Sequence, residues 1–240
     1  MYCDTTERQK GGRRCRWNYL GRLGYQEARE IQRALVEARQ DSRIDDSLLL
    51  LEHPPTYTLG RRTEASHLLL PRERLERLGA AVVDVDRGGQ ATYHGPGQLV
   101  GYPIVGLRGW GGPREYVRAL ETVLIGTLDY YGVQAGRVDG LTGVWVGDRK
   151  IAAIGVKVSR GVTSHGFALN VTTDLSWFDH IIPCGVHDKE VTSLGRLLGR
   201  CVSLEEVAAI VAGQFSFRIG CAMEIDGAGE MLLLSGTPSG

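Results

Sequence analysis

The sequence lacks the features that mark several large classes of protein. Its 240 residues carry 28 basic and 28 acidic side chains, so nothing indicates the basic surface of a nucleic-acid binder. No apolar run approaches the roughly 20 residues that a transmembrane helix needs. Residues 1–17 contain no apolar stretch of the kind found in secretory signals. We therefore expect a cytoplasmic protein that binds neither nucleic acid nor membrane.

Cysteine and nucleotide-binding motifs are also scarce. The five cysteines are odd in number and form no C-x-x-C pair, which argues against a disulfide framework or a Cys-rich zinc site. No G-x-G-x-x-G lies between a strand and a helix, and no G-x-x-x-x-G-K-[ST] phosphate loop is present. The chain thus gives no support for NAD or ATP, and we expect no cofactor and no resident metal.

What the chain does contain is a mixture of helical and strand patterns, with no repeat and no long linker. Apolar spacing and capping residues predict helices over 25–39, 71–79, 113–131 and 203–212. Strands are predicted over 47–51, 81–86, 99–105, 143–146, 150–159 and within 165–172. This order favours an α+β fold, with a mixed sheet and flanking helices, over a doubly wound one.

Domain boundaries follow from the composition of the two ends. The arginine-rich start predicts a mobile N-terminal tail over 1–18, and the Gly- and Ser-rich end predicts a C-terminal tail over 221–240. A single domain is expected over 19–220.

The least ordinary segment is Arg87–Gln98, RGGQATYHGPGQ. Four glycines and a proline in this stretch exclude a regular helix or a central strand. Arg87, Tyr93 and His94 add polar groups to a backbone that a ligand can approach closely. Because predicted strands precede and follow it, the segment is a candidate binding loop. A surface hairpin with no ligand is the alternative.

Cys184 is the cysteine whose surroundings best suit a nucleophile. Pro183 stops any helix before it, and Gly185 permits an exposed turn with free backbone amides beside the sulfur. A catalytic thiol needs a cationic or basic partner, and His180 and His187 are near in sequence. A buried structural cysteine is the alternative, and a His180, Cys184 and His187 metal site is disfavoured by the proline.

Lys150 is the second candidate. In a regular strand from 150 onward, Lys150 shares a face with Ala152, Ile154 and the valines that follow at the same spacing. A lysine on an apolar face is costly unless its ammonium meets an anion or loses its proton. The alternative is a lysine at a strand end that reaches water, and Lys157 is more simply a solvated residue.

Taken together, these segments resemble the lipoyl(octanoyl) transferase family. The matching motifs are LLLLEHPPTYTLGRR (48–62), RGGQATYHGPGQLVGYPI (87–104), KIAAIGVKVS (150–159), HGFALNV (165–171), IIPCGV (181–186) and VTSL (191–194). They cover roughly residues 19–212, and they depart from the family pattern only slightly, at Ala91 and Val186.

The resemblance implies the fold of lipoate- and biotin-protein ligase catalytic domains and a Cys/Lys dyad. Cys184 matches the cysteine that carries the acyl group, and Lys150 matches the lysine that lowers its pKa. The implied substrate-binding residues are Arg87, Gly88, Gly89, Gln90, Ala91, Thr92, Tyr93, His94, Ala153, Ile154, Gly155, Gly166, Phe167 and Ala168.

The implied reaction moves an octanoyl group from octanoyl-acyl carrier protein to a lysine of a lipoyl domain, the first step of endogenous lipoate synthesis. The expected acceptors are the lipoyl domains of 2-oxoacid dehydrogenases and the glycine cleavage H protein. An ATP-dependent lipoate- or biotin-protein ligase of the same fold is the nearest alternative. A non-enzymatic acyl-binding protein that kept the pocket is a second.

Overall fold

A computed structural model describes residues 13–182 and 190–226 of the chain. The strands are β1 (Arg13–Arg22), β2 (Asp46–Glu52), β3 (Thr56–Leu59), β4 (Ala81–Asp84), β5 (Ala91–His94), β6 (Gln98–Ile104), β7 (Gly136–Val138), β8 (Leu141–Val146), β9 (Arg149–Ser159), β10 (Val162–Asn170) and β11 (Cys221–Ile225). The α-helices are α1 (Tyr25–Gln40), α2 (Arg72–Arg77), α3 (Pro113–Tyr130), α4 (Leu194–Leu198) and α5 (Leu204–Ile219), and two 3₁₀ turns are η1 (Ala65–His67) and η2 (Leu175–His180).

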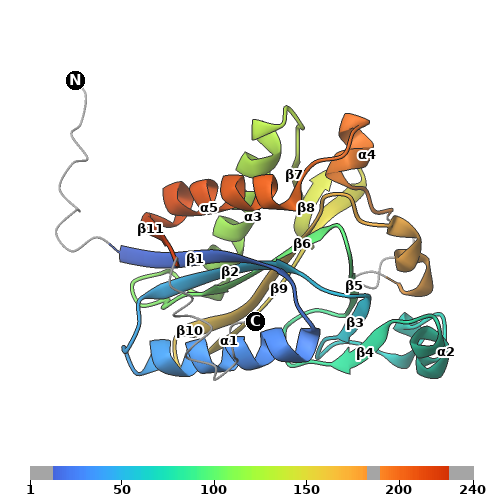
Figure 1. The fold of residues 1–240 in the computed structure, drawn as a ribbon, viewed down its shortest axis with the longest axis horizontal. Helices are drawn as coiled ribbons and strands as arrows, with labels where there is room; N and C mark the ends of the chain where they lie inside the picture. Colours follow the sequence, from blue (N-terminus) through green and yellow to red (C-terminus); the bar gives the residue numbers. More distant parts are fainter. Residues whose placement is uncertain (1–12, 183–189, 227–240) are drawn as a thin grey trace.

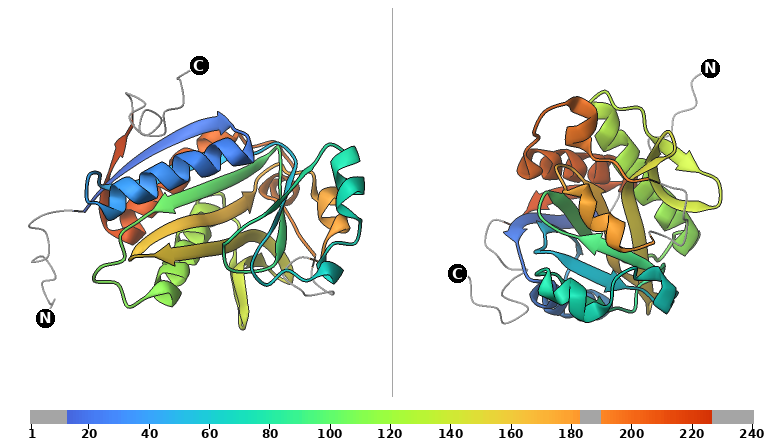
Figure 2. Two further views of the ribbon diagram at one scale, coloured as in Figure 1. Left: turned by 90° about the horizontal axis from the view of Figure 1, so that it is seen from below. Right: turned by 90° about the vertical axis from the view of Figure 1, so that its right-hand side faces the viewer.

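A mixed eight-stranded sheet, in the order β11-β1-β2-β6-β10-β9-β8-β7, forms the centre of the molecule. Helix α1 covers one face, and α3 and α5 cover the other (Figure 1). A smaller sheet of three strands, β4-β3-β5, lies with α2 at one end of the large sheet (Figure 2). The predicted α+β architecture with flanking helices is confirmed.

Alternating side chains divide the core into two layers beside the large sheet. Along β10, Phe167 and Leu169 face the core under α3 and α5, whereas Val162 and Ala168 face α1. Helix α1 presents Ala28, Ile31 and Leu35 to that second layer, as its predicted spacing requires. On the α1 side of the sheet, β9 and β10 carry small residues, among them Ala153, Gly155, Gly166 and Ala168.

The predicted helices and strands of the central region are all present. At α5 the Ser203 hydroxyl accepts a hydrogen bond from the backbone amide of Glu206, at 3.5 Å, which is the capping contact that the sequence indicates. The helix then runs on to Ile219, past its predicted end at 212. Strands β1, β3, β5, β7 and β11 and the short helix α4 were not predicted from the sequence.

Strand β1 differs most from expectation, because residues 13–18 were assigned to a mobile tail. The strand pairs with β2 on one side and with β11 on the other, both in parallel. The predicted boundaries at residues 18/19 and 220/221 therefore fall inside the sheet or directly beside one of its strands. Cys15, also placed in the tail by the sequence, is fully buried in the core under α5.

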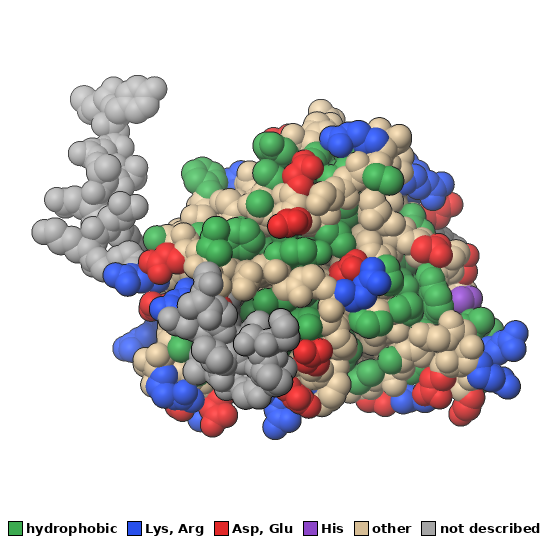
Figure 3. Space-filling view, in the orientation of Figure 1, with side chains coloured by type: hydrophobic (Ala, Val, Ile, Leu, Met, Phe, Trp, Pro, Cys, Tyr) green, Lys and Arg blue, Asp and Glu red, His purple; other side chains and the backbone are tan. Residues whose placement is uncertain are grey.

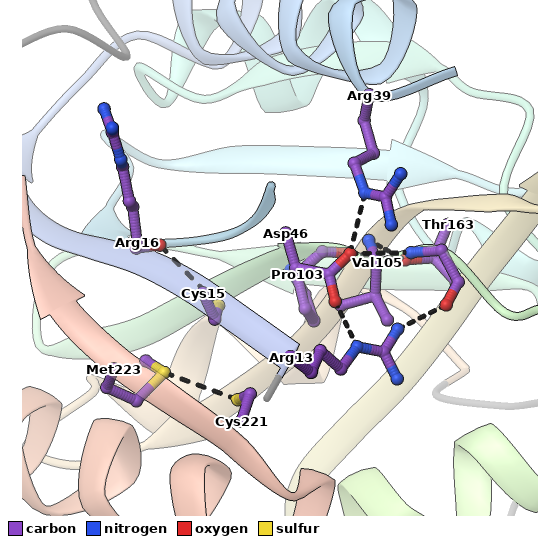
Figure 4. A network of polar contacts seen from close by, with 11 residues as sticks. Arg13, Cys15, Arg16, Arg39, Asp46, Pro103, Val105, Thr163, Cys221 and Met223 are labelled. Carbon is purple, nitrogen blue, oxygen red and sulfur yellow. Dashed lines mark hydrogen bonds and ion pairs between the residues drawn. The ribbon is translucent and has the colours of Figure 1, made fainter. Parts of the chain in front are cut away.

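A buried carboxylate fixes β1 at this edge (Figure 4). Asp46, at the start of β2, is 2% exposed and accepts hydrogen bonds from the guanidinium groups of Arg13 and Arg39. Its Oδ1 also accepts from the backbone amide of Gly106 at 2.9 Å. One carboxylate thus joins β1, α1, β2 and the segment after β6, and it supplies the counter-charge for Arg13, one of the arginines that make β1 resemble a polar tail.

The outer surface mixes charges of both signs. Figure 3 shows acidic and basic side chains interspersed over one face, with no extended area of a single sign. None of the helices in the described parts of the chain is both long enough and apolar enough to cross a membrane.

Replacing Asp46 by Asn should lower the free energy of unfolding by about 3 kcal/mol, because two arginines lose their buried counter-charge. Urea denaturation of the purified variant measures this change. The neighbouring Asp45→Asn is the matched control, since Asp45 is exposed and should change stability by less than about 0.5 kcal/mol. Equal effects of the two substitutions would contradict this role of Asp46.

Candidate active site

The floor of the candidate site is a run of small residues on two paired strands. Ala153 of β9 lies opposite Ala168 of β10, and two residues further along Gly155 lies opposite Gly166. No side chain at these four positions is larger than a methyl group, so the sheet is hollowed on its α1 side. We call this hollow the small-residue groove. The volume inside it that is open to the centres of water-sized molecules is about 60 Å³.

The glycine-rich segment forms the roof of the small-residue groove. The backbone amide of Gly88 donates to the carbonyl of Val156 at 3.1 Å and so fastens the segment to β9. A Cβ atom at Gly155 would lie 2.9 Å from the Gly88 carbonyl oxygen, which is closer than real Cβ contacts. Gly155 is therefore required for the roof to approach the floor this closely.

Most of the predicted binding residues meet around this groove. Those that border it are Arg87, Gly89, Gln90, Ala91, Thr92, His94, Ala153, Ile154, Gly155, Gly166, Phe167 and Ala168. Ile154 and Phe167 do so although their side chains pack into the core under α3 and α5. Gly88 and Tyr93 are not among the bordering residues. The ring of Tyr93 instead stacks on Trp177 in the small-sheet core, with ring centroids 5.4 Å apart.

Four further residues border the groove that the sequence did not single out. Tyr25 comes from α1, Val100 and Tyr102 come from β6, and His165 comes from β10. The first three reach the site only through the packing of distant segments, which local sequence patterns do not predict. His165 has a positive φ of 56°, a backbone conformation that no sequence motif here predicts.

Lys150 lies at one end of the groove, on the opposite face of β9 from the one predicted. The pairing of β8 with β9 shifts register between Val144/Ala152 and Trp145/Lys150, so β9 carries one extra residue there. As a result Ile151 and Ala152 both pack into the core under α3 and α5. This β-bulge reverses the alternation and turns Lys150 toward the small-residue groove.

A small cavity joins Lys150 to the groove. Its lining includes Lys150, Asn170 and Val191, and it shares Thr92, Ala153 and Ala168 with the lining of the groove. Lys150 is 6% exposed, so the predicted alternative of a strand-end lysine that reaches water is wrong. Its ammonium lies 4.7 Å from the ring centroid of Trp145, a favourable cation–π distance.

Cys184 lies outside the described residues, as does His187. The described chain before it ends at Ile182, whose amide donates to the carbonyl of His67 at 3.0 Å. The described chain resumes at Glu190, whose carbonyl accepts a hydrogen bond from the amide of Lys150 at 2.9 Å.

The cysteines that the structure does describe lie elsewhere. Cys15 and Cys221 are buried near the β1–β11 edge, where the sulfur of Cys221 contacts that of Met223 at 3.7 Å (Figure 4). Cys201 is exposed. None of these three borders the small-residue groove or the cavity at Lys150.

The other residues considered from the sequence have defined partners. His180 donates a hydrogen bond from its Nδ1 to the Tyr57 hydroxyl, at 2.9 Å, because that hydroxyl donates its own proton to the carbonyl of Trp177. Lys157 forms an ion pair with Asp86 rather than standing free in solvent. Within residues 13–182 and 190–226, no group of three His, Cys, Asp or Glu side chains could hold a metal ion.

A chain of hydrogen bonds begins in the roof of the groove. The Arg87 guanidinium donates to the Thr58 hydroxyl at 2.8 Å, and that hydroxyl donates to Nε2 of His94 at 3.3 Å. Nδ1 of His94 then donates to the Gln98 side-chain oxygen at 2.8 Å. This tautomer follows because the Gln98 amide nitrogen already donates to Asn170.

The chain continues to the strand that carries Lys150. The Asn170 amide donates to the carbonyl of Thr192 at 3.0 Å, and the amide of Thr192 donates to the carbonyl of Lys150 at 2.9 Å. These hydrogen bonds link buried polar groups of the roof and floor to the strand that carries Lys150. His94 thus holds the roof through hydrogen bonds at both ring nitrogens.

Comparison with known proteins decides the family. The model of the lipoyl protein ligase A/B catalytic domain matches residues 24–216 of this chain. The chain belongs to that family. The lipoyl protein ligase A/B family thereby accounts for the motifs in the glycine-rich segment, β9 and β10, and the resemblance drawn from them is confirmed.

Relatives in the lipoyl protein ligase A/B family match most of the chain. An octanoyltransferase of Solibacter usitatus is 56% identical over 198 residues, which are 81% of this chain and 88% of that protein. A mitochondrial octanoyltransferase of Arabidopsis thaliana is 49% identical over 190 residues, 78% of this chain and 81% of that protein. A bipartite lipoate protein ligase of Thermoplasma acidophilum shares the fold, with a TM-score of 0.70 at 18% identity over 93% of this chain and 90% of that one.

Two histidines beside the groove should make stability fall in acid. Burial lowers the pKa of His94 to about 3 and that of His53 to about 4, from an ordinary 6.5. Between pH 6.5 and 4 the unfolded chain therefore binds protons that the folded protein excludes, and stability rises with pH.

From pH 7 to pH 5 each histidine should cost about 2 kcal/mol of unfolding free energy. Urea denaturation at the two pH values, with His94→Asn and His53→Asn, measures the two contributions. Each substitution should remove about 2 kcal/mol of the wild-type pH dependence. A variant that keeps the full pH dependence would show that its histidine is not the group that titrates.

Proposed function

We propose that this protein transfers an octanoyl group from octanoyl-acyl carrier protein to a lysine of a lipoyl domain, through a thioester on Cys184. The observation that carries the proposal is the small-residue groove, an apolar floor that ends beside a buried lysine. Two relatives that are 49% and 56% identical to the chain are octanoyltransferases, and this supports octanoyl as the group transferred. The acceptors we propose are the lipoyl domains of 2-oxoacid dehydrogenases and the glycine cleavage H protein.

The floor and roof suit a straight saturated chain. Burying a methylene contributes about 0.8 kcal/mol, so six methylenes along Ala153, Gly155 and their partners would contribute roughly 5 kcal/mol. Larger side chains at these positions would fill the groove. A chain that lies along the two strands would have its reacting carbonyl at one end of the groove, beside Lys150.

The first half-reaction forms the acyl-enzyme. The Lys150 ammonium stabilises the Cys184 thiolate, which attacks the carbonyl carbon of the octanoyl thioester. The tetrahedral intermediate expels the thiolate of the carrier, which takes a proton from Lys150. An octanoyl thioester on Cys184 and a neutral Lys150 amine remain.

The second half-reaction uses that neutral amine. The lysine of the lipoyl domain attacks the acyl-enzyme carbonyl, and Lys150 accepts the proton that the attacking amine loses. Collapse of the intermediate releases the Cys184 thiolate and leaves an octanoyl amide. Because an amide is more stable than a thioester, the sequence runs downhill without ATP. The need for a free thiol fits the reducing cytoplasm.

Mixing the protein with octanoyl-acyl carrier protein in nucleotide-free buffer should add one octanoyl group to the intact mass. Cys184→Ser should abolish the adduct, because no nucleophile remains at the end of the groove. Cys201→Ser is the matched control and should keep it, since Cys201 is exposed and does not border the groove. An absolute requirement for ATP, or an adduct that survives Cys184→Ser, would refute the proposal and favour a ligase or a different nucleophile.

Lys150→Met should raise the apparent pKa of the Cys184 thiol, because a neutral side chain of similar length replaces the ammonium. The rate of alkylation by iodoacetamide against pH, read at Cys184 by peptide mass, measures this pKa. An opposite charge within a few ångströms lowers a pKa by about 1–3 units, so a shift of at least about one unit is expected. Lys150→Arg keeps the charge and should keep most of the depression. An unchanged profile in Lys150→Met would exclude Lys150 as the electrostatic partner.

A further inference from the structure

The small-residue groove has a second end, opposite Lys150. Along β9 and β10 the rungs on the α1 side run from Ala153/Ala168 to Gly155/Gly166 and then to Lys157/Ser164. The first rung borders the cavity at Lys150, and the last borders a separate charged pocket. His165 borders both the groove and that charged pocket, so it stands between them.

His165 reaches this position through a break in strand alternation. Its neighbours at the same parity, Thr163 and Phe167, lie on the α3 side of β10, where Phe167 joins the core. The positive φ of His165, 56°, turns its ring to the α1 side instead. Its backbone amide donates to the side-chain oxygen of Gln32 in α1 at 3.0 Å, which holds the turned backbone in place.

Two charged groups fix the ring of His165 at the end of the groove. Its Nε2 lies 2.9 Å from Asp86, and the other carboxylate oxygen of Asp86 pairs with the ammonium of Lys157. Burial would raise the pKa of Asp86, but the hydrogen bonds from Lys157 and His165 outweigh it and hold that pKa below its ordinary value. The carboxylate therefore stays charged. We call His165, Asp86 and Lys157 the end wall.

Beyond the end wall lies the charged pocket, open to solvent and unsuited to a methyl terminus. Its lining includes Arg29, Arg33 and Glu37 of α1 and Arg160 of the β9–β10 turn. The His165 side chain is only 7% exposed and borders both cavities, so its ring lies between the groove and this pocket. An acyl chain that extended past the end wall would place its last carbons among charged groups and water instead of on the apolar floor.

We propose that the end wall of His165, Asp86 and Lys157 sets the longest acyl chain that the enzyme accepts. This proposal rests on the proposed octanoyl transfer. From Ala168 to His165 the floor spans three residues, roughly 10 Å, which is about the length of an extended octanoyl chain. A dodecanoyl chain is about one and a half times as long and would meet the ring of His165 with its terminal carbons.

Opening the end wall should therefore admit longer chains. The test compares the initial rates of acyl-enzyme formation from the octanoyl and dodecanoyl thioesters of acyl carrier protein, by intact mass at equal donor concentration. His165→Gly removes the ring and suits the positive φ. Because the clash between the terminal carbons and the ring is relieved, the dodecanoyl-to-octanoyl rate ratio should rise at least about tenfold over wild type.

Two more variants keep the test decisive. Asp86→Ala releases the His165 ring without changing the β10 backbone, and it should raise the ratio in the same direction if His165→Gly does not fold. Ser42→Gly is the matched control, because Ser42 also has a positive φ, of 57°, but lies in an exposed turn after α1. Its ratio should equal that of wild type.

The outcomes separate the two proposals. If wild type forms no acyl-enzyme from either thioester, the proposed function fails. If wild type forms the octanoyl-enzyme but His165→Gly and Asp86→Ala, both folded by circular dichroism, leave the ratio unchanged, the end wall does not set chain length. A rise in the ratio in Ser42→Gly would also overturn the assignment.

Discussion

The structure depends on a pairing of residues that have almost no side chains. Where Ala153 meets Ala168 and Gly155 meets Gly166, two central strands leave the α1 side of the sheet hollow. An unfilled hollow of this kind costs packing energy in a protein interior. It is maintained because the glycine-rich segment is held over it by the Gly88–Val156 hydrogen bond and by the polar chain through His94.

Both ends of the hollow are made by interruptions of regular β-structure. A β-bulge turns Lys150 onto the small-residue face at one end, and a left-handed residue turns His165 onto it at the other. In a regular strand both side chains would point into the core under α3 and α5, where a charge is costly. Such irregularities commonly occur next to active sites, where they redirect a side chain. Here they leave an apolar floor between two polar groups.

The sequence predicts the parts of this arrangement that depend on local pattern. Periodicity located α1, α3 and the β8–β9 hairpin, and the glycines of 87–98 indicated a ligand loop. It assigned Lys150 to the wrong face, because alternation assumes a regular strand and the bulge is visible only in the pairing with β8. It also placed β1 in a tail, because Arg13 becomes compatible with a strand only when Asp46, far along the chain, supplies the counter-charge.

The family resemblance identified more of the residues that border the groove than any single motif did. The residues that the motifs missed, such as Tyr25 and Tyr102, are contributed by α1 and β6 through tertiary packing. The sequence around Cys184 indicated a nucleophile, and the described chain on its far side returns to Lys150 through Glu190. Local chemistry thus singled out Cys184 and Lys150 as candidates, whereas the shape of the groove required the fold.

The most direct measurement of the central claim is a crystal structure of the octanoyl-enzyme. The account predicts electron density for an extended chain over Ala153 and Gly155, with its carbonyl at the Lys150 end and its last carbon facing His165. Density that leads away from these strands, or a carbonyl remote from Lys150, would contradict it.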